Sequence, residues 1–250
     1  TDADINVFGP LARGADDLDL LLGVLAGPEP ERAPAWRVEL PEPRTTLGDY
    51  RIGVWLDDPV CPVESSYAAV LATTLDRLDD AGARVDEAHP PVAFADQLAL
   101  FYGLIAPAMA PNLPDDVGDA VAGPHARWLR NQKERARLRA VWAEWFERYD
   151  LLLCPVTPTP AIRHQQEGEV MERRLVIDGV DRPYVDEVSW TGLIGLVNLP
   201  SAVPPLGRTA EGLPVGIQVV APYLHDRDAI RAAGLIAEAV GGGYQRPPGF

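Results

Sequence analysis

Residues 190–223 read WTGLIGLVNLPSAVPPLGRTAEGLPVGIQVVAPY, and this stretch decides the fold class of the chain. It holds two apolar runs, Leu193–Val203 and Leu213–Val220, which proline and glycine divide into pieces of strand length. Both runs are apolar on successive residues, which is typical of strands buried on both faces and covered by helices. The stretch therefore predicts the core of an α/β sheet.

Length and composition are those of a globular domain. The chain has 250 residues, 47% hydrophobic and 24% charged, so we expect one domain over residues 1–250. No run of about 18 apolar residues is present, and no membrane association is expected. The net charge of −15 would repel a phosphate backbone, which argues against nucleic acid as a partner. The two cysteines, Cys61 and Cys154, are too few for a disulfide scaffold and favour a reducing, cytoplasmic compartment.

Outside the opening stretch, a strand, a helix and a strand follow one another. Tyr50–Trp55 reads as a strand, Glu64–Ala81 as an amphipathic helix and Ala83–Glu87 as a second strand, which together make the unit of a parallel sheet. Asp150–Cys154 reads as a further buried strand. The predicted fold class is α/β, with a mixed, largely parallel central sheet covered by helices on both faces.

Two helices and three irregular segments complete the prediction. Ala93–Met109 is apolar enough for a buried helix, and His125–Tyr149 should be the longest helix, with a basic first half. We interpret that basic half as a solvated helix face, with a nucleic-acid patch as the weaker alternative. The segments expected to be irregular are a surface connection over residues 28–48, a loop over residues 111–124 and a polar excursion with a small hairpin over residues 163–188.

The sequence offers no convincing catalytic set of its own. The pattern Gly-x-Ser-x-Gly is absent, none of the four histidines has a second ligand at zinc spacing, and no glycine-rich loop opens a helix, so we expect neither metal nor cofactor. Lys133 is the single lysine. Cys154, at a strand end, is interpreted as a buried apolar residue, with a nucleophile as the alternative.

Several short motifs resemble the C-terminal part of amidase signature family hydrolases. They are Gly-Pro-Leu-Ala-Arg at 9–13 before a leucine-rich helix, Asn-Leu-Pro at 198–200, Pro-Leu-Gly at 205–207 and Gly-Leu-Pro-Val-Gly-Ile-Gln at 212–218. The resemblance covers nearly the whole chain and is weakest over Asp96–Arg137. The first residues, TDADINVFGP, carry neither a signal-peptide pattern nor an initiator methionine, which predicts that the chain is part of something longer.

The resemblance also implies where the chemistry lies. Members of this family use a serine nucleophile, a second serine joined by a cis peptide bond and a lysine, all located before the segment that resembles residues 6–26. We therefore assign no catalytic residue in this chain. The residues that the resemblance places in a substrate pocket are Thr157, in a Pro-Thr-Pro loop, together with Trp190, Asn198 and Gln218. For each of the four, a purely structural role is the alternative.

The expected function follows from this resemblance. It implies an amidase that hydrolyses a C–N amide bond of a small substrate through an acyl-serine intermediate in the complete protein. This chain would supply scaffold and pocket and would be inactive by itself. Its partner would be a missing N-terminal half or a second copy. The alternatives are a non-catalytic α/β binding or partner-subunit module and a half that resembles the A-type subunit of an amidotransferase.

Overall fold

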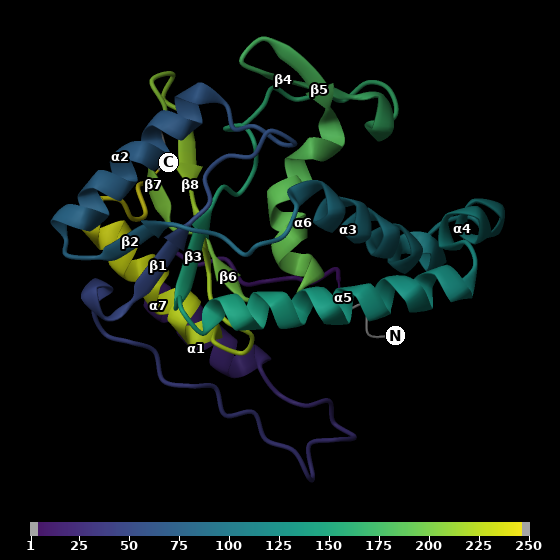
Figure 1. The fold of residues 1–250 in the computed structure, drawn as a ribbon, viewed down its shortest axis with the longest axis horizontal. Helices are drawn as coiled ribbons and strands as arrows, with labels where there is room; N and C mark the ends of the chain where they lie inside the picture. The colour runs from purple at the N-terminus through teal and green to yellow at the C-terminus, as the bar shows by residue number, and fades with distance from the viewer. Residues whose placement is uncertain (1–4, 247–250) are drawn as a thin grey trace.

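The computed structural model describes residues 5–246, and its centre is a five-stranded mixed sheet (Figure 1). The strands lie in the order β2-β1-β3-β9-β6. Their bounds are β1 Arg51–Val54, β2 Arg84–Glu87, β3 Leu151–Cys154, β6 Ser201–Ala202 and β9 Gln218–Val220. β1 pairs in parallel with β2 and with β3, whereas β9 runs antiparallel to β3 and to β6. The predicted mixed α/β sheet is confirmed.

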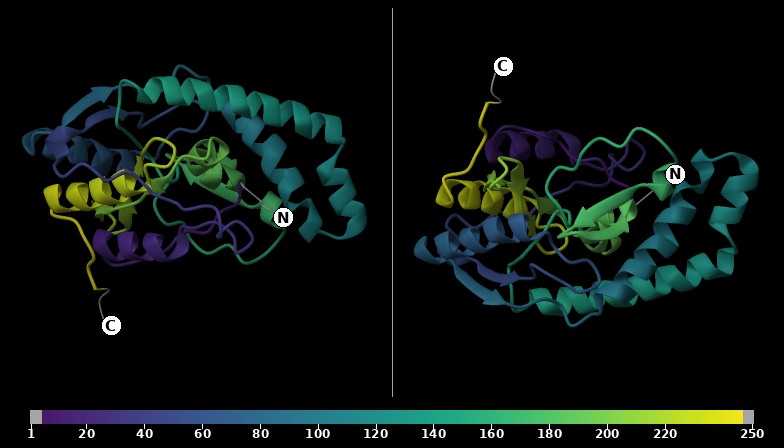
Figure 2. Two further views of the ribbon diagram at one scale, coloured as in Figure 1. Left: turned by 90° about the horizontal axis from the view of Figure 1, so that it is seen from below. Right: turned by 90° about the horizontal axis from the view of Figure 1, so that it is seen from above.

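Helices cover both faces of this sheet (Figure 2). α7 (Asp226–Ala239) packs against β6 and β9, and α1 (Ala15–Leu25) packs against α7. On the other face, Trp145 of α5 (His125–Phe146) lies over β1 at Gly53. A Cβ atom at Gly53 would stand 2.5 Å from the Trp145 ring and 2.7 Å from the Ala88 carbonyl oxygen, so only glycine fits at this position.

The predicted strand, helix and strand unit is present as β1, α2 (Ser65–Asp80) and β2. Because β1 and β2 are parallel, α2 carries the chain back along the sheet. Residues 26–46, between α1 and the short 3₁₀ helix η1 (Leu47–Asp49), form neither helix nor strand. The same segment brings Arg44 to the amino end of β3, where it contacts Asp150.

Three helices form an arm that extends away from the sheet (Figure 1). α3 (Phe94–Met109) and α5 lie side by side and are linked by a hydrogen bond from Trp142 Nε1 to Gln97 Oε1 at 3.0 Å. At the tip stand η2 (Ala110–Asn112) and α4 (Asp115–Ala122). The prediction of a loop over residues 111–124 is therefore wrong. The two aspartates of the first turn of α4 suit a helix N-terminus, which offsets the unfavourable glycine and prolines around it.

The opening stretch was only partly predicted. Its first apolar run begins as a helix, α6 (Ser189–Leu196), and only Ser201–Ala202 of that run belongs to the sheet, so the expectation of a strand over Leu193–Val203 is wrong for its first half. The second run divides at Ile217 into β8 (Pro214–Gly216), which pairs with β7 (Pro205–Arg208) in a separate hairpin, and β9. α6 is buried on nearly every side and therefore shows no amphipathic stripe.

The polar excursion contains the expected hairpin. β4 (Arg174–Ile177) and β5 (Val180–Pro183) pair antiparallel between the 3₁₀ helices η3 (Val170–Glu172) and η4 (Tyr184–Val188). Asp178 and Gly179 both have positive φ, 48° and 81°, as a two-residue type I′ turn requires. Among the described residues, no helix is long and apolar enough to cross a membrane. The outermost residues of the predicted domain 1–250 lie outside the described part.

Candidate functional site

A cleft lies at the carboxyl end of β3, where the chain continues into the loop of residues 155–160. Its volume is about 370 Å³, which is within the range of small-molecule sites. Its walls come from α2, this loop, η4 and the hairpin β7–β8. The lining residues are Tyr67, Val156, Thr157, Thr159, Pro160, Ala161, Ile162, Glu187, Val203, Pro214, Val215 and Gly216. Because α/β sheets bind ligands beyond the carboxyl ends of their parallel strands, this cleft is the candidate site.

Side-chain hydrogen bonds fix the loop that forms the cleft. Gln218, which is 2% exposed, donates from Nε2 to the Pro155 carbonyl oxygen at 2.7 Å. The Tyr67 hydroxyl donates to the Gly216 carbonyl oxygen at 2.6 Å and accepts the Val156 N–H at 3.3 Å. These contacts stabilise the loop, whose prolines cannot donate backbone hydrogen bonds to a strand.

The polar groups of the cleft are two threonines and a carboxyl group. Thr157 Oγ1 donates to the Thr159 carbonyl oxygen at 2.6 Å, and buried Thr159 donates from its own Oγ1 to Glu187 Oε1 at 2.8 Å. Burial raises the pKa of Glu187, and the hydrogen bond from Thr159 opposes part of that rise. The cleft thus presents carbonyl oxygens, hydroxyls and a titratable acid, which can hydrogen-bond an amide.

Trp190 lies at the same end of the sheet but inside the core. It is 1% exposed, and its Nε1 donates to the Cys61 carbonyl oxygen at 3.2 Å. Its ring meets Trp55 and Phe94 edge-on, at centroid distances of 5.5 and 4.9 Å, and Trp55 stacks on His89 at 4.2 Å. Trp190 therefore supports the carboxyl ends of β1 and β2, since Trp55 and His89 follow those strands.

Asn198 lies at the other end of α6. Its φ of 57° turns the chain after the helix, a conformation that asparagine tolerates better than most residues. Its Oδ1 accepts a hydrogen bond from Nη2 of Arg135 at 2.9 Å, and Arg135 also donates to the Leu196 carbonyl oxygen. Asn198 therefore shapes the turn between α6 and β6.

Of the four predicted pocket residues, three share one end of the sheet. Thr157 lines the cleft, Gln218 holds its loop and Trp190 lies in the adjoining core, whereas Asn198 lies at the far end of α6. Two polar residues that shape these regions, Glu187 and Arg135, were not predicted from the sequence. Glu187 could not have been found, because no local sequence motif marks it. Buried Arg135 could have been found, because it lies one heptad before Trp142 on the buried side of α5.

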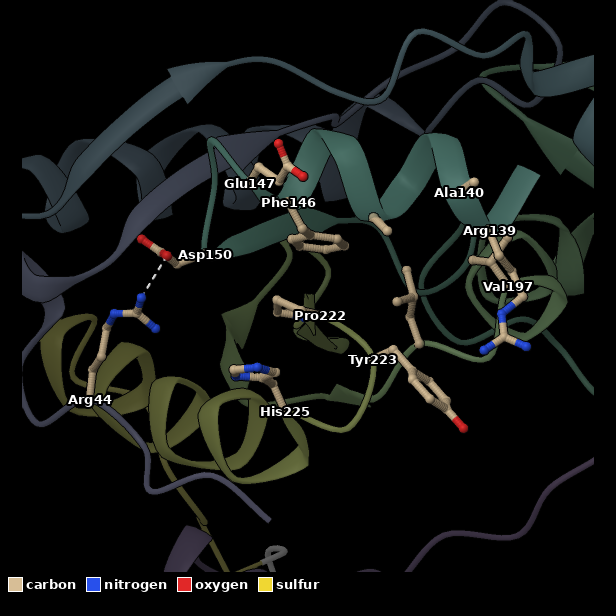
Figure 3. A pocket seen from close by; sticks show the side chains of 12 residues that line it. Arg44, Arg139, Ala140, Phe146, Glu147, Asp150, Val197, Pro222, Tyr223 and His225 are labelled. Atoms are coloured by element: carbon tan, nitrogen blue, oxygen red, sulfur yellow. Dashed lines mark hydrogen bonds and ion pairs between the residues drawn. The ribbon is translucent and has the colours of Figure 1, made fainter. Parts of the chain in front are cut away.

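A second and larger cavity lies at the opposite end of the sheet (Figure 3). Its volume is about 560 Å³. It lies between α5, the turn after α6 and the turn before α7, near the amino ends of β1 and β3. The lining residues are Arg44, Arg139, Ala140, Ala143, Phe146, Glu147, Asp150, Val197, Leu199, Pro222, Tyr223 and His225. We call it the Arg139–His225 pocket.

None of the four serines forms a nucleophile–base pair in the described residues. Ser65 donates from Oγ to the carboxylate of Asp178 at 2.8 Å, and Ser66 donates to Glu64 at 2.7 Å. Ser189 is fully buried, and Ser201 is exposed on β6. No serine is hydrogen-bonded to a histidine or to the lysine within residues 5–246, so a Ser-His or Ser-Lys arrangement is not formed there.

The remaining nucleophile candidates also lack activation. Burial raises the pKa of Cys61 to about 12 and raises the pKa of Cys154 as well, so both thiols stay protonated at neutral pH. Lys133 is exposed on α5. In the part of the chain that the structure describes, no three His, Cys, Asp or Glu side chains gather as metal ligands would.

Comparison with known proteins identifies relatives of this chain. The A-type subunit of the glutamyl-tRNA(Gln) amidotransferase from Deinococcus deserti is 28% identical over 286 aligned positions, which cover 96% of this chain and 56% of the relative. Its Rhodospirillum rubrum counterpart is 29% identical, with 98% and 55% covered. The chain thus spans about half the length of the curated relatives it matches.

A solved structure and a family model agree with these relatives. The crystal structure of a bacterial aryl acylamidase of the amidase signature family superposes with a TM-score of 0.71 at 24% identity, over 92% of this chain and 52% of that one. At this identity the likeness establishes the fold. The amidase family model matches residues 2–119 and 116–229, which together are most of the sequence. The chain therefore belongs to the amidase family, the same family that its motifs indicate.

Proposed function

We propose that this chain is the C-terminal part of a protein that hydrolyses a C–N amide bond of a small substrate through an acyl-serine intermediate. Family membership carries the proposal, and the cleft at the carboxyl end of β3 supports it. Within the described residues the cleft has polar groups suited to an amide but no serine beside a base. In this proposal the chain contributes scaffold and substrate pocket, and the nucleophile comes from elsewhere in the complete protein.

The four residues predicted from the sequence would divide this work. Thr157 would contact the substrate directly, because it lines the cleft. Gln218 would act by holding the Pro155 carbonyl group, and Trp190 by supporting the strand ends behind the cleft. Asn198 would set the turn that places β6 beside β9. We add Glu187 as a fifth pocket residue, since its carboxyl group is oriented by Thr159.

The second candidate function is that of a half resembling the A-type subunit of an amidotransferase. The curated relatives in D. deserti and R. rubrum carry that name, which favours this interpretation over a non-catalytic module. Such a protein would deliver the released ammonia to a second acyl group, whereas a simple hydrolase would release it into solution. A test that separates the two measures whether ammonia release by the complete protein needs a second acyl acceptor.

Exposed apolar groups support the proposal that further protein covers this chain. Phe8 and Leu11 are 95% and 97% exposed, and α1 buries none of its residues. Within the described sheet, β6 pairs only with β9 and leaves an edge. We propose that a preceding half of the protein or a second copy covers these apolar side chains and the free edge of β6. We also keep a cytoplasmic location as a proposal, supported by the two unpaired cysteines.

The experiment compares residues 1–250 with the protein extended at its N-terminus. We expect the 250-residue chain neither to hydrolyse aryl amides nor to react with a fluorophosphonate probe, and the extended protein to do both. Mass spectrometry of the labelled peptide locates the nucleophile. Labelling at any of the four serines of this chain would show that the proposed division of labour is wrong.

A further inference from the structure

The Arg139–His225 pocket is separate from the cleft proposed for amide hydrolysis. Asp150 and Arg51 mark the amino ends of β3 and β1, and Asp150 lines the pocket, whereas the cleft lies beyond the carboxyl end of β3. The two sites thus occupy opposite ends of the same strands. The function proposed above makes no use of this pocket.

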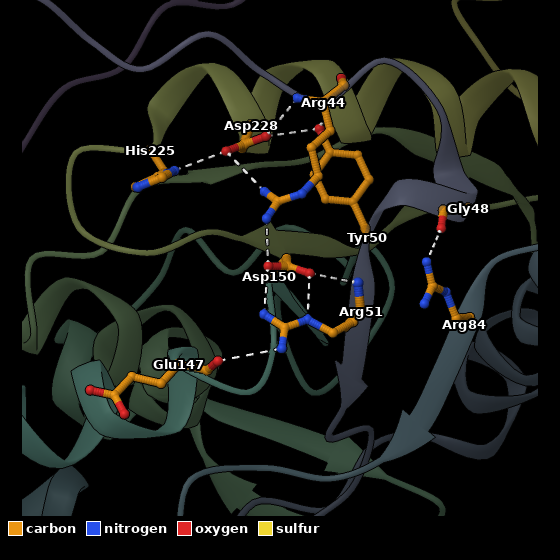
Figure 4. A network of polar contacts seen from close by, with 9 residues as sticks. All are labelled: Arg44, Gly48, Tyr50, Arg51, Arg84, Glu147, Asp150, His225 and Asp228. Atoms are coloured by element: carbon orange, nitrogen blue, oxygen red, sulfur yellow. Dashed lines mark hydrogen bonds and ion pairs between the residues drawn. The ribbon is translucent and has the colours of Figure 1, made fainter.

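A buried carboxylate fixes one wall of the pocket (Figure 4). Asp228 is 3% exposed, and its Oδ2 lies 2.9 Å from Nδ1 of His225. Its Oδ1 accepts the Tyr50 hydroxyl at 2.9 Å and the Arg44 backbone N–H at 3.0 Å. Because a carboxylate only accepts, we assign the proton of neutral His225 to Nδ1. Nε2 is then an oriented hydrogen-bond acceptor, and Figure 4 shows it pointing away from Asp228.

The positive charges of the pocket differ in how they are compensated. Arg44 donates to Asp150 Oδ1 at 2.7 Å, and with Arg51 it balances the charges of Asp150 and Asp228. Arg139 makes no ion pair with a carboxylate of the described residues. Its guanidinium lies over the Tyr223 ring, 4.8 Å from the centroid, which leaves its N–H groups available.

An apolar surface joins the two polar walls. Figure 3 shows Arg139 on one side of the pocket and His225 on the other, with the Phe146 ring and Pro222 near His225. Val197 and Leu199 add to this surface. Glu147 also lines the pocket, but its carboxylate points away from His225 and Pro222 in Figure 3. A ligand that fits would have a charged end, an apolar body and a hydrogen-bond donor.

We propose that the Arg139–His225 pocket binds a small organic carboxylate with an apolar body. Its carboxylate pairs with the free guanidinium of Arg139, its body lies on Phe146 and Pro222, and a hydroxyl or N–H group at its far end donates to Nε2 of His225. Guanidinium groups recognise carboxylates through two parallel hydrogen bonds, which gives the site its preference for a carboxylate over a neutral ligand.

The probe for this site is 3-(4-hydroxyphenyl)propionate, titrated into the complete protein and followed by calorimetry. We expect saturable binding at a single site. Two analogues of the probe test its two polar contacts separately. 3-Phenylpropionate lacks the hydrogen-bond donor, and 3-(4-hydroxyphenyl)propionamide lacks the negative charge. Each should bind several-fold more weakly, since each leaves a polar group of the pocket without its partner. No saturation by the probe up to about 10 mM would overturn the proposal.

Substitutions test the assignment of residues. Arg139→Gln and His225→Phe should each weaken binding about tenfold, a change of about 1.4 kcal/mol. Arg137→Gln is the matched control, because Arg137 lies on the same helix but is paired with Glu134 at 2.8 Å. If His225→Phe fails to fold, the binding measurement on Arg139→Gln tests the proposal by itself. This substitution should leave the fold intact, because Arg139 makes no ion pair with a carboxylate of the described residues. Equal affinity of Arg139→Gln and Arg137→Gln would overturn the proposal.

Discussion

Replacing Asp150 by asparagine should destabilise the protein strongly, because this carboxylate serves two guanidinium groups. Asp150 is 6% exposed, and its oxygens accept from Arg44 Nη2 at 2.7 Å and from the Arg51 backbone N–H, Nε and Nη2 at 2.8, 2.9 and 3.0 Å. An asparagine keeps the shape but turns an NH₂ group toward these donors.

The size of the stability loss in Asp150→Asn depends on how exposed its two partners, Arg44 and Arg51, are. Leaving the partner of a buried ion pair uncompensated costs about 3–5 kcal/mol. Arg44 and Arg51 are 38% and 46% exposed and can turn toward water, so we expect a loss of about 2–3 kcal/mol. The matched control is Asp181→Asn. Asp181 accepts from Arg174 Nε at 2.9 Å, the same distance as between Arg51 Nε and Asp150. Both Arg174 and Asp181 are exposed, so the loss should stay below about 1 kcal/mol.

Urea unfolding, followed by circular dichroism, measures the unfolding free energies of the wild type and the two variants. The pH dependence of these free energies gives a second test. Burial raises the pKa of Asp150, but the hydrogen bonds from Arg51 and the charges of Arg44 and Arg51 outweigh it, so the net pKa lies below the ordinary 3.8. A lowered folded-state pKa means that the carboxylate stabilises the fold above pH 3.8 and that this contribution disappears as the pH falls through the folded-state pKa. Equal losses for Asp150→Asn and Asp181→Asn, or a gap between wild type and Asp150→Asn that persists in acid, would refute this reasoning.

Three further substitutions or reactions test the packing and the cleft. Gly53→Ala should cost about 1–3 kcal/mol of unfolding free energy in the same urea experiment, because the added methyl group overpacks against the Trp145 ring. Gly23→Ala on α1, where a Cβ would meet no atom within 4 Å, is the control and should be neutral or gain up to about 1 kcal/mol. Burial raises the pKa of the Cys61 thiol to about 12, so this thiol should not react with Ellman's reagent until urea unfolds the protein. Rapid reaction of Cys61 in the native protein would contradict this. Thr159→Val removes the hydrogen bond that lowers the pKa of Glu187, so a carbon-13 titration of that carboxyl group should shift further upward, and an unchanged midpoint would argue against the geometry of the cleft.

Elements with clear periodicity could be predicted from the sequence. The helices α2, α3 and α5, the strands β1, β2 and β3 and the Asp178-Gly179 hairpin turn lie within a few residues of their predicted bounds. Each has either an apolar stripe, a run of buried residues or a turn pair with one conformation. These signals are local, and for this reason the sequence alone was sufficient.

α6 shows where local signals fail. It is buried on nearly all sides, so its residues are apolar in succession, which is the same pattern that a strand with two buried faces gives. Gly192, a poor helix former, lies within this helix. In the structure it lies against Phe101, and a Cβ atom there would stand 2.9 Å from that ring. The glycine is therefore explained by a neighbour 91 positions away in sequence, which periodicity cannot reveal.

The polar sites were harder to predict than the fold because their partners are distant in sequence. Arg44 meets Asp150 and Asp228 across 106 and 184 positions. It comes from residues 26–46, a segment without helix or strand that reads as a plain surface connection. Yet its backbone N–H orients the carboxylate that orients His225. A proline-rich connection is useful here because its restricted backbone holds Arg44 in place at a low entropic cost. Changes in this connection should therefore alter the Arg139–His225 pocket while leaving the cleft beyond β3 intact.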